Sequence, residues 1–453
     1  MEGFTARLCD RLAGIVYEDL PPEVVGTVKK LILDTLGLIA GGATAPGVDE
    51  LNRRLERWES RGSATGLVGK RRYSPPTAAL ANGTAAHALD FDDLHDPARV
   101  HTSAVVLPSL LASAEDIGLV NGKDFILAMA IGAELHARLG LACWNSLGKG
   151  WHPTMVFGTL AASIAAGRLL KLDAKRLGHA LGMAYHQASG SAQSMRDGAL
   201  SKRLGAGFAA RAAVLSAFLA SDGLDSTVRT LEGNAGLFSL YERDEVEPDR
   251  IVRDLGKDWQ VPNYSFKPYP GCRCNHTLIG LGVRLHDEGI RPEAITELEL
   301  GLSRVNWLSV GAPYDPARDS VVQAQFSAAY SFCRALQDGR VDLRSFDRPA
   351  ITDPKISHLT ARTRVVEDAQ IDPHAIEPAR VRIRLVDGGS REVFSSSMPG
   401  SPQQPMSQSD FHSKFIDCLQ SGLGQPPDAA IDLLDSIERL ENLADASVLV
   451  QHF

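Results

Sequence analysis

The spacing of apolar residues predicts helices over most of the first 250 positions. Pro21, Pro22 and Glu23 are typical of a helix start, because proline fits the first turn and an acid there complements the helix dipole. Apolar residues then recur at helical spacing up to Gly41 and Gly42, which predict the helix end. These apolar residues are Val24, Val28, Leu31, Ile32 and Leu36.

Two later helical segments are rich in small side chains. They are residues 158–167 (GTLAASIAAG) and residues 206–220 (AGFAARAAVLSAFLA). Small side chains let helix axes approach closely, which favours interior helices of a compact domain. Alanine is also a strong helix former by itself, so each segment taken alone is equally well explained by helix propensity.

The pattern changes near Pro262, and strand signals follow. Residues 295–302 (ITELELGL) and 379–385 (ARVRIRL) alternate apolar and polar side chains. An Asp-Gly-Gly turn at 387–389 leads from the second of these segments into residues 391–395 (REVFS). Alternation on both sides of a tight turn predicts a β-hairpin.

The remaining pattern completes the predicted domain plan. Residues 323–337 have helical spacing, and a Ser/Pro/Gln-rich loop at 400–409 leads into further helices that run to the end. We therefore predict a mainly α chain with a large all-helical domain, residues 1–263 and 399–453. A smaller α+β domain occupies residues 264–398. No internal repeat at a solenoid period is visible.

Composition and charge narrow the class of protein. The chain has 453 residues, of which 44% are hydrophobic, so it is long enough for two or three domains with a sizeable core. It carries 47 basic and 55 acidic side chains, a formal charge of −8. Nucleic-acid binding depends on Lys and Arg neutralising phosphates, so we expect no nucleic-acid partner. An anionic ligand must then be held by a local basic pocket.

The sequence also suggests a compartment. Six cysteines in so long a chain do not make a disulfide framework. Acidic and basic residues interrupt the first 20 positions, which argues against a signal peptide. The most apolar run, residues 153–166, ends before Arg168 and is too short to span a bilayer. We expect a cytoplasmic protein with no membrane partner.

The densest cluster of titratable groups begins at His87. Asp90, Asp92 and Asp93 follow, and His101 lies a few residues further on. Tuned carboxylates and imidazoles are what general acid–base catalysis requires. The same side chains are common metal ligands. A helix end followed by solvated acids explains the spacing equally well.

Two further segments place charged or titratable groups before a helix. The Gly-rich loop at 148–154 puts His152 at the start of a small-residue helix, where free backbone N–H groups suit a carboxylate. Lys202 and Arg203 also stand at a helix start, where cations oppose the helix dipole. This placement hints at an anionic ligand, although a loop histidine and a solvated charge run are the simpler interpretations.

The last candidate segment, residues 266–276 (FKPYPGCRCNH), marks the change from helical to α+β pattern. It presents Lys267, Arg273 and His276 from a loop stiffened by proline. Cys272 and Cys274 are one residue apart and have no second pair, so a metal site here is weakly indicated. No P-loop, dinucleotide-binding fingerprint or nucleophile elbow occurs.

Taken together and in this order, the segments resemble the MmgE/PrpD family. This family includes 2-methylcitrate dehydratase, cis-aconitate decarboxylase and iminodisuccinate epimerase. The matching stretches lie at 82–115, 150–167, 181–190, 197–236 and 266–276. The resemblance implies a cofactor-independent enzyme, a homodimer, and a large helical domain with a smaller α+β lid domain.

The family's active-site residues fall on positions that the chemistry above already singles out. They are Asp90, His101, His152, Lys202 and Lys267. We predict Asp90 and His101 as the acid–base pair. His152 and the two lysines are predicted to stabilise the carboxylate and the charge that develops beside it.

Arg203, Arg273 and His276 are predicted to help bind the substrate, a small anionic carboxylate. The sequence also departs from the family pattern at four positions. Leu94 stands where many members have threonine, Thr102 where they commonly have proline, Gly205 where many have histidine, and Cys272 where one decarboxylase branch has histidine. Such losses of polar groups change which substrate hydroxyl or carboxylate a site accepts.

Several reactions fit this prediction. The first is a 2-methylcitrate dehydratase-like hydro-lyase that abstracts a proton next to a carboxylate of a small di- or tricarboxylate. An epimerase of a dicarboxylate is the second, and a cis-aconitate decarboxylase-like enzyme is ranked third because of Cys272. A non-catalytic carboxylate-binding protein and a metallohydrolase are more remote.

Overall fold

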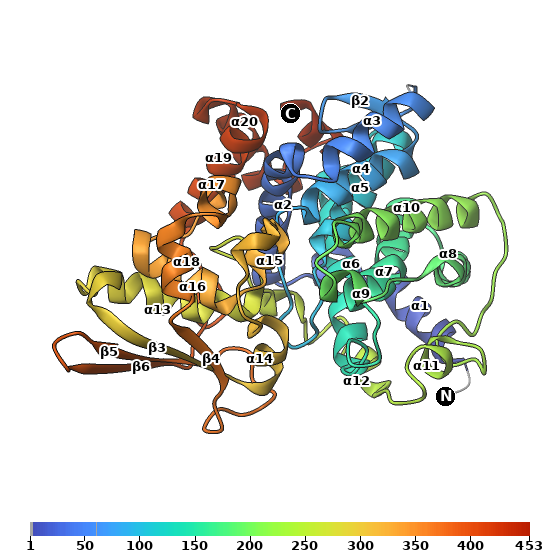
Figure 1. Cartoon of the computed structure of the whole chain (residues 1–453). Coiled ribbons are helices and arrows are strands. Elements are labelled where there is room, and N and C mark those ends of the chain that lie inside the picture. Colours follow the sequence, from blue (N-terminus) through green and yellow to red (C-terminus); the bar gives the residue numbers. More distant parts are fainter. Residues whose placement is uncertain (1–2, 60) are drawn as a thin grey trace. The chain divides into compact units, whose positions relative to one another are not determined.

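The computed structural model describes residues 3–59 and 61–453, and these form two compact units. Unit 1 comprises Met1–Tyr264 and Gln408–Phe453, and unit 2 comprises Ser265–Ser407. Figure 1 shows the elements of both units along the chain.

Unit 1 is built mainly of helices. Its elements are α1 (Phe4–Gly14), α2 (Pro22–Gly41), α3 (Val48–Trp58), β1 (Ala64–Gly66), β2 (Arg71–Tyr73), α4 (Pro75–His87), α5 (Ser103–Ile117), α6 (Gly122–Ala142), α7 (Pro153–Leu169), α8 (Ala174–Gln187), α9 (Gln193–Arg196), α10 (Ser201–Ser221), α11 (Leu237–Leu240), α12 (Asp249–Val252), α19 (Gln408–Leu423) and α20 (Ile431–Glu438). The predicted first-domain helix is confirmed as α2, including its start at Pro22 and its end at Gly41.

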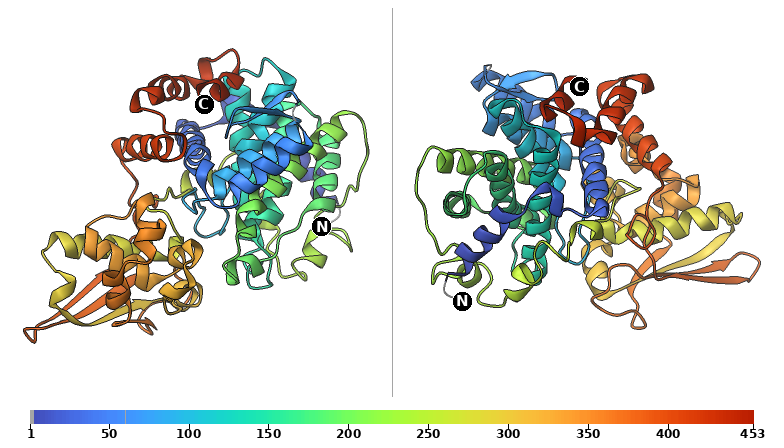
Figure 2. Two further views of the ribbon diagram at one scale, coloured as in Figure 1. Left: turned by 45° about the horizontal axis from the view of Figure 1, so that its top comes forward. Right: turned by 180° about the vertical axis from the view of Figure 1, so that it is seen from behind.

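Unit 2 combines helices with a four-stranded sheet. Its elements are α13 (His276–Asp287), β3 (Ile295–Leu302), α14 (Arg304–Val310), α15 (Val321–Gln325), α16 (Ala328–Asp338), α17 (Arg348–Ile351), α18 (Pro354–Thr360), β4 (Thr363–Glu367), β5 (Ala379–Leu385) and β6 (Ser390–Ser395). The strand order is β4-β3-β5-β6, with β3 and β4 parallel and the other neighbours antiparallel. The predicted hairpin is therefore confirmed as β5 and β6. Figure 2 shows the sheet in two further views.

The small residues of the interior helices bring helix backbones into close approach. A Cβ on Gly207 of α10 would lie 2.4 Å from the carbonyl oxygen of Leu80 in α4. A Cβ on Gly83 of α4 would lie 3.0 Å from the Ala104 carbonyl oxygen in α5. The small side chains in these helices are thus a packing requirement at the α4–α10 and α4–α5 crossings.

The predicted fold class, a mainly α chain with an all-helical large domain and a smaller α+β lid domain, is wrong as stated: the predominance of helix is roughly consistent with the structure, but the large unit is not all-helical and an α+β lid is not specifically shown. Helix accounts for 58% and strand for 8% of the structure, which is a mixture of helices with small sheets. Unit 1 itself contains the antiparallel pair β1 and β2. Each of these strands has three residues, which is too short for alternation to be visible in a sequence.

Among residues 3–59 and 61–453, two helices are apolar and long enough to cross a membrane by length and composition alone. They are α6 and α10, and the bent pair Pro22–Thr44 and Val48–Trp58 would count as a third. The run at 153–166, which the sequence analysis names as the most apolar, is part of the shorter α7. In α6, 94% of the most apolar window is buried inside the protein, and in α10 61% is buried. Packing within the protein thus accounts for the apolar character of α6.

Candidate active site

The candidate active site surrounds the loop that follows α4. That helix ends at His87, and the chain passes through Asp90, Asp92 and Asp93 before α5 begins at Ser103. All three carboxylates are buried, and burying a carboxylate is costly unless cations or hydrogen-bond donors surround it. Asp90 has a left-handed backbone with φ of 52°, a conformation that aspartate tolerates better than most residues. The partners of these acids define the site.

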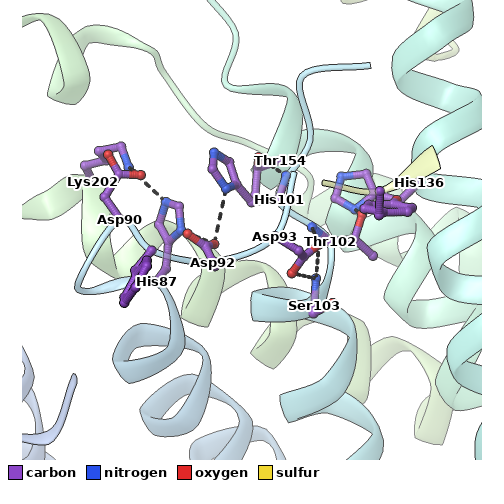
Figure 3. Close-up of polar contacts among 12 residues, drawn as sticks. His87, Asp90, Asp92, Asp93, His101, Thr102, Ser103, His136, Thr154 and Lys202 are labelled. Carbon is purple, nitrogen blue, oxygen red and sulfur yellow. Dashed lines mark hydrogen bonds and ion pairs between the residues drawn. The ribbon is translucent and has the colours of Figure 1, made fainter. Parts of the chain in front are cut away.

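Five titratable side chains of this region form one continuous series of contacts, which we call the polar chain (Figure 3). Lys202 Nζ lies 3.4 Å from Asp90 Oδ1 and 3.1 Å from His87 Nε2. His87 Nδ1 lies 2.7 Å from Asp92 Oδ2, and the same oxygen lies 3.3 Å from His101 Nδ1. The polar chain thus runs from Asp90 through Lys202, His87 and Asp92 to His101.

The electrostatics of the polar chain determine where its protons lie. Burial, followed by the charge of Lys202, lowers the pKa of His87 to about 4. His87 is therefore a neutral imidazole, which accepts from Lys202 at Nε2 and donates to Asp92 from Nδ1. Burial alone would raise the pKa of Asp92, but the neighbouring His101 and His87 hold that pKa well below its usual range. Asp92 is consequently an ionised carboxylate shared by two histidines.

His152 lies beside the polar chain, at the position that the sequence predicts for it. It is the residue immediately before α7, and its ring centroid lies 6.3 Å from that of His87. Burial, followed by the charge of Lys202, lowers the pKa of His152 well below its usual value. His152 is therefore a neutral group in the candidate site and a hydrogen-bonding partner instead of a cation.

Asp93 faces the other way and supports the start of α5. Its carboxylate accepts hydrogen bonds from the backbone N–H groups of Thr102, at 3.2 Å, and Ser103, at 3.3 Å. Burial raises the pKa of Asp93 to about 7, and the carboxylates of Asp92 and Asp34 add to this effect. Asp93 is thus a structural acid next to the polar chain.

The raised pKa of Asp93 predicts a pH-dependent stability. The folded state holds this proton more tightly than the unfolded chain, whose aspartates ionise near pH 4. The stability that Asp93 contributes is therefore present below about pH 4 and is lost as the pH rises towards about 7. We expect Asp93→Asn to reduce the fall in unfolding free energy between pH 5 and 7 by about 2 kcal/mol. Urea unfolding across this range measures the slope. The exposed Asp222→Asn variant is the control, and an equal slope in Asp93→Asn and wild type would contradict the prediction.

The polar chain also contains a possible set of metal ligands. One ligand atom each from His87, Asp92 and His101 lies within 4.8 Å of the others. Two imidazoles and a carboxylate suit zinc and related cations. A cation bound there would replace the hydrogen bond between His87 and Asp92.

The structure brings four of the predicted catalytic residues together in unit 1. Asp90, His101, His152 and Lys202 all belong to the region just described. Arg203 follows Lys202 in α10, but its Nη1 donates to the carbonyl oxygen of Pro46 at 2.7 Å, so its guanidinium supports a backbone turn. Three predicted residues belong to unit 2: Lys267, Arg273 and His276.

Within unit 2, two of these residues contact each other. Arg273 Nη1 donates to His276 Nδ1 at 3.3 Å and to the Pro399 carbonyl oxygen at 2.5 Å. Arg273, His276 and Lys267 are all buried. These contacts make Arg273 a residue that orients His276 and joins it to the segment at Pro399.

His87 and Asp92, the two central members of the polar chain, have no role predicted from the sequence. Both stand in the predicted cluster of titratable groups, and their spacing contains a usable signal. His87 is the last residue of α4 and Asp92 lies five positions later, so a short loop can fold the carboxylate back onto the imidazole at the helix end. The carboxylates of Asp90 and Asp92 have different partners: Asp90 contacts Lys202, whereas Asp92 contacts His87.

Unit 1 thus gathers buried imidazoles, carboxylates and a lysine, which are the groups that general acid–base catalysis uses. Residues 6–248 match the MmgE/PrpD N-terminal domain, and residues 269–439 match the MmgE/PrpD C-terminal domain. The chain belongs to the MmgE/PrpD family.

Curated relatives of the chain carry lyase names. It is 27% identical to the cis-aconitate decarboxylase-like protein oryM of Aspergillus oryzae, over 98% of this chain and 96% of that protein. It is 27% identical to a cis-aconitate decarboxylase of Aspergillus terreus, over 99% and 95% of the two chains. It is 28% identical to the cis-aconitate decarboxylase of Homo sapiens, over 99% and 94%. The chain is thus a lyase-type member of its family.

Proposed function

We propose that the protein is a cofactor-independent lyase that transfers a proton at the carbon next to a carboxylate of a small di- or tricarboxylate. The observation that carries this proposal is the polar chain, which joins a lysine suited to hold a carboxylate to a histidine suited to move a proton. The C–H group next to a carboxylate is a very weak acid. Moving its proton therefore needs both a positioned acid–base group and positive charge near the carboxylate.

His101 is the proton-transfer group of this proposal. Its side chain is 14% exposed, so a ligand can reach the ring. Asp92 is bound at Nδ1, which leaves Nε2 to exchange a proton with the substrate, and the carboxylate stabilises the imidazolium that forms. We propose Asp92 as the partner of His101 in place of Asp90, because Asp90 lies against Lys202.

Lys202 and His152 are proposed to bind the substrate carboxylate next to the reacting carbon. Lys202 supplies a cation where negative charge develops, and neutral His152 supplies a hydrogen bond. Asp90 forms an ion pair with Lys202 and so helps to hold its ammonium group in place. Lys267 of unit 2 remains our predicted second cation, with Arg273 and His276 as predicted supporting residues.

The relatives support decarboxylation of cis-aconitate as the first reaction to test. In that reaction the electrons of the broken C–C bond form a new double bond, the old double bond takes up one proton, and carbon dioxide leaves. In dehydration the site removes one proton from carbon and the hydroxyl leaves as water. Cys272 favours dehydration over decarboxylation, and the names of the relatives favour the opposite order.

One assay separates these reactions. The purified protein is incubated with cis-aconitate and, separately, with 2-methylcitrate, and released carbon dioxide and ultraviolet-absorbing unsaturated acid are measured. We expect carbon dioxide from cis-aconitate, and the same rate after treatment with EDTA. Unsaturated acid from 2-methylcitrate without carbon dioxide would identify a hydro-lyase, and deuterium uptake without net conversion an epimerase. No turnover of any polycarboxylate, or loss of turnover with EDTA, would contradict the proposal.

A further inference from the structure

A lysine near the C-terminus reaches the loop that carries the site acids. Lys414 belongs to α19, which lies more than 300 positions after that loop in the sequence. Its Nζ donates to the carbonyl oxygen of Phe91 at 2.8 Å and lies 2.7 Å from Asp34 Oδ1 in α2. The same ammonium lies 3.9 Å from the centre of the Phe91 ring. The Lys414 ammonium thus binds the backbone carbonyl of Phe91, the residue between Asp90 and Asp92.

Helix α19 is held closely against α2. A Cβ on Gly37 of α2 would lie 2.7 Å from the ring of Phe415. A Cβ on Gly422 of α19 would lie 1.8 Å from the carbonyl oxygen of Ala40. These positions must remain glycine for the two helices to approach so closely, so the backbone that carries Lys414 has little freedom to shift.

Burying the charges of Lys414 and Asp34 costs free energy of folding, and the contacts that Lys414 makes are specific. Its side chain and that of Asp34 are both almost fully buried, and a buried ion pair often contributes no more stability than apolar side chains of similar size. Phe91 lies between an aspartate with φ of 52° and the aspartate that contacts two histidines. The Phe91 carbonyl belongs to the peptide that joins Phe91 to Asp92, so fixing it restrains the backbone that carries Asp92 and limits the movement of Asp90 on the other side of Phe91.

We infer that Lys414 is a positioning residue, which fixes the Phe91 peptide so that Asp90 faces Lys202 and Asp92 faces His87 and His101. This inference rests on the proposed function of the polar chain and adds a residue that lies outside it. It predicts that Lys414 affects turnover in a way that is separable from its effect on stability.

The test compares three variants by turnover of the wild-type substrate and by thermal unfolding. Lys414→Met leaves Asp34 buried with its charge, so we expect a lower melting temperature and a kcat about 10- to 100-fold lower, with KM little changed. Asp34→Leu combined with Lys414→Met replaces the pair by apolar side chains. We expect this double variant to recover stability and to keep the low kcat. Asp34→Asn is the matched control, because it leaves the lysine bound to Phe91 and should keep most of the kcat.

Recovery of kcat together with stability in the double variant would overturn the inference and leave Lys414 a purely structural residue. Wild-type turnover tests the proposed function separately. A crystal structure of the double variant gives a second readout that needs no substrate. We expect the Phe91 peptide to be turned and the distance between Asp92 and His101 to be longer, and an unchanged loop would overturn the inference even if no substrate is found.

Discussion

Replacing Asp92 with asparagine is expected to lower kcat about 10²- to 10⁴-fold, the range that general acid–base catalysis contributes. One oxygen of Asp92 accepts a hydrogen bond from His87 and lies 3.3 Å from His101 Nδ1. An asparagine amide has a single acceptor oxygen and an NH₂ group, and it has no charge to stabilise an imidazolium on His101. The wrong tautomer of His101 would become favourable, as would a ring turned away from the substrate. Steady-state kinetics with the substrate that the carbon dioxide and unsaturated-acid assay identifies measure this loss.

The neighbouring acid provides a matched control for this variant. Asp93 is buried in the same loop, but its carboxylate accepts from the backbone of α5 and contacts neither histidine of the polar chain. Asp93→Asn should therefore change stability and leave kcat within about tenfold of wild type. If Asp92→Asn retained a similar kcat, Asp92 would not be the partner through which His101 acts.

The elements that could be predicted from sequence are those with a strong local signal. Helix α2 has prolines at its start, glycines at its end and an apolar stripe between them, and strands β5 and β6 flank a turn whose Gly388 has φ of 85°. The predicted helix over residues 323–337 is less simple. It is divided into α15 and α16, because Ser327 adopts an extended backbone and its hydroxyl accepts from Tyr330 N–H to begin a new helix.

The site, too, could be predicted only as far as local sequence signals reach. Motif positions indicated Asp90, His101, His152 and Lys202, and these residues lie together in unit 1. The direction in which each carboxylate points depends on the backbone of one loop, where Asp90 and Asp92 face different partners. The different directions of the two carboxylates depend on the left-handed backbone of Asp90 and on Lys414 of α19. Neither feature can be predicted from the local spacing of residues. The roles of His87 and Asp92 therefore become visible only from their contacts in the structure.

A buried ion pair within α6, between Glu134 and Arg138, also contributes to stability, because both of its side chains bind the backbone of a distant segment. Both side chains are buried, and Arg138 Nε lies 2.5 Å from Glu134 Oε1. The guanidinium also donates to the carbonyl oxygen of Arg253 at 2.7 Å, and Glu134 Oε2 accepts from Gln260 N–H at 2.6 Å. These two side chains therefore join the irregular segment before Tyr264 to the centre of unit 1.

Arg138→Met is accordingly expected to lower the free energy of unfolding by about 3 to 5 kcal/mol, the cost of leaving one partner of a buried pair without its counterion. Burial already raises the pKa of Glu134, so the variant should recover part of its loss at low pH, where the carboxyl takes up a proton. Urea unfolding at two pH values measures both effects. The exposed pair of Arg53 and Asp49 has the same helical spacing, and Arg53→Met should cost less than about 1 kcal/mol. Equal losses in the two variants would mean that burial does not govern the contribution of Arg138, and that water reaches the carbonyl groups it binds.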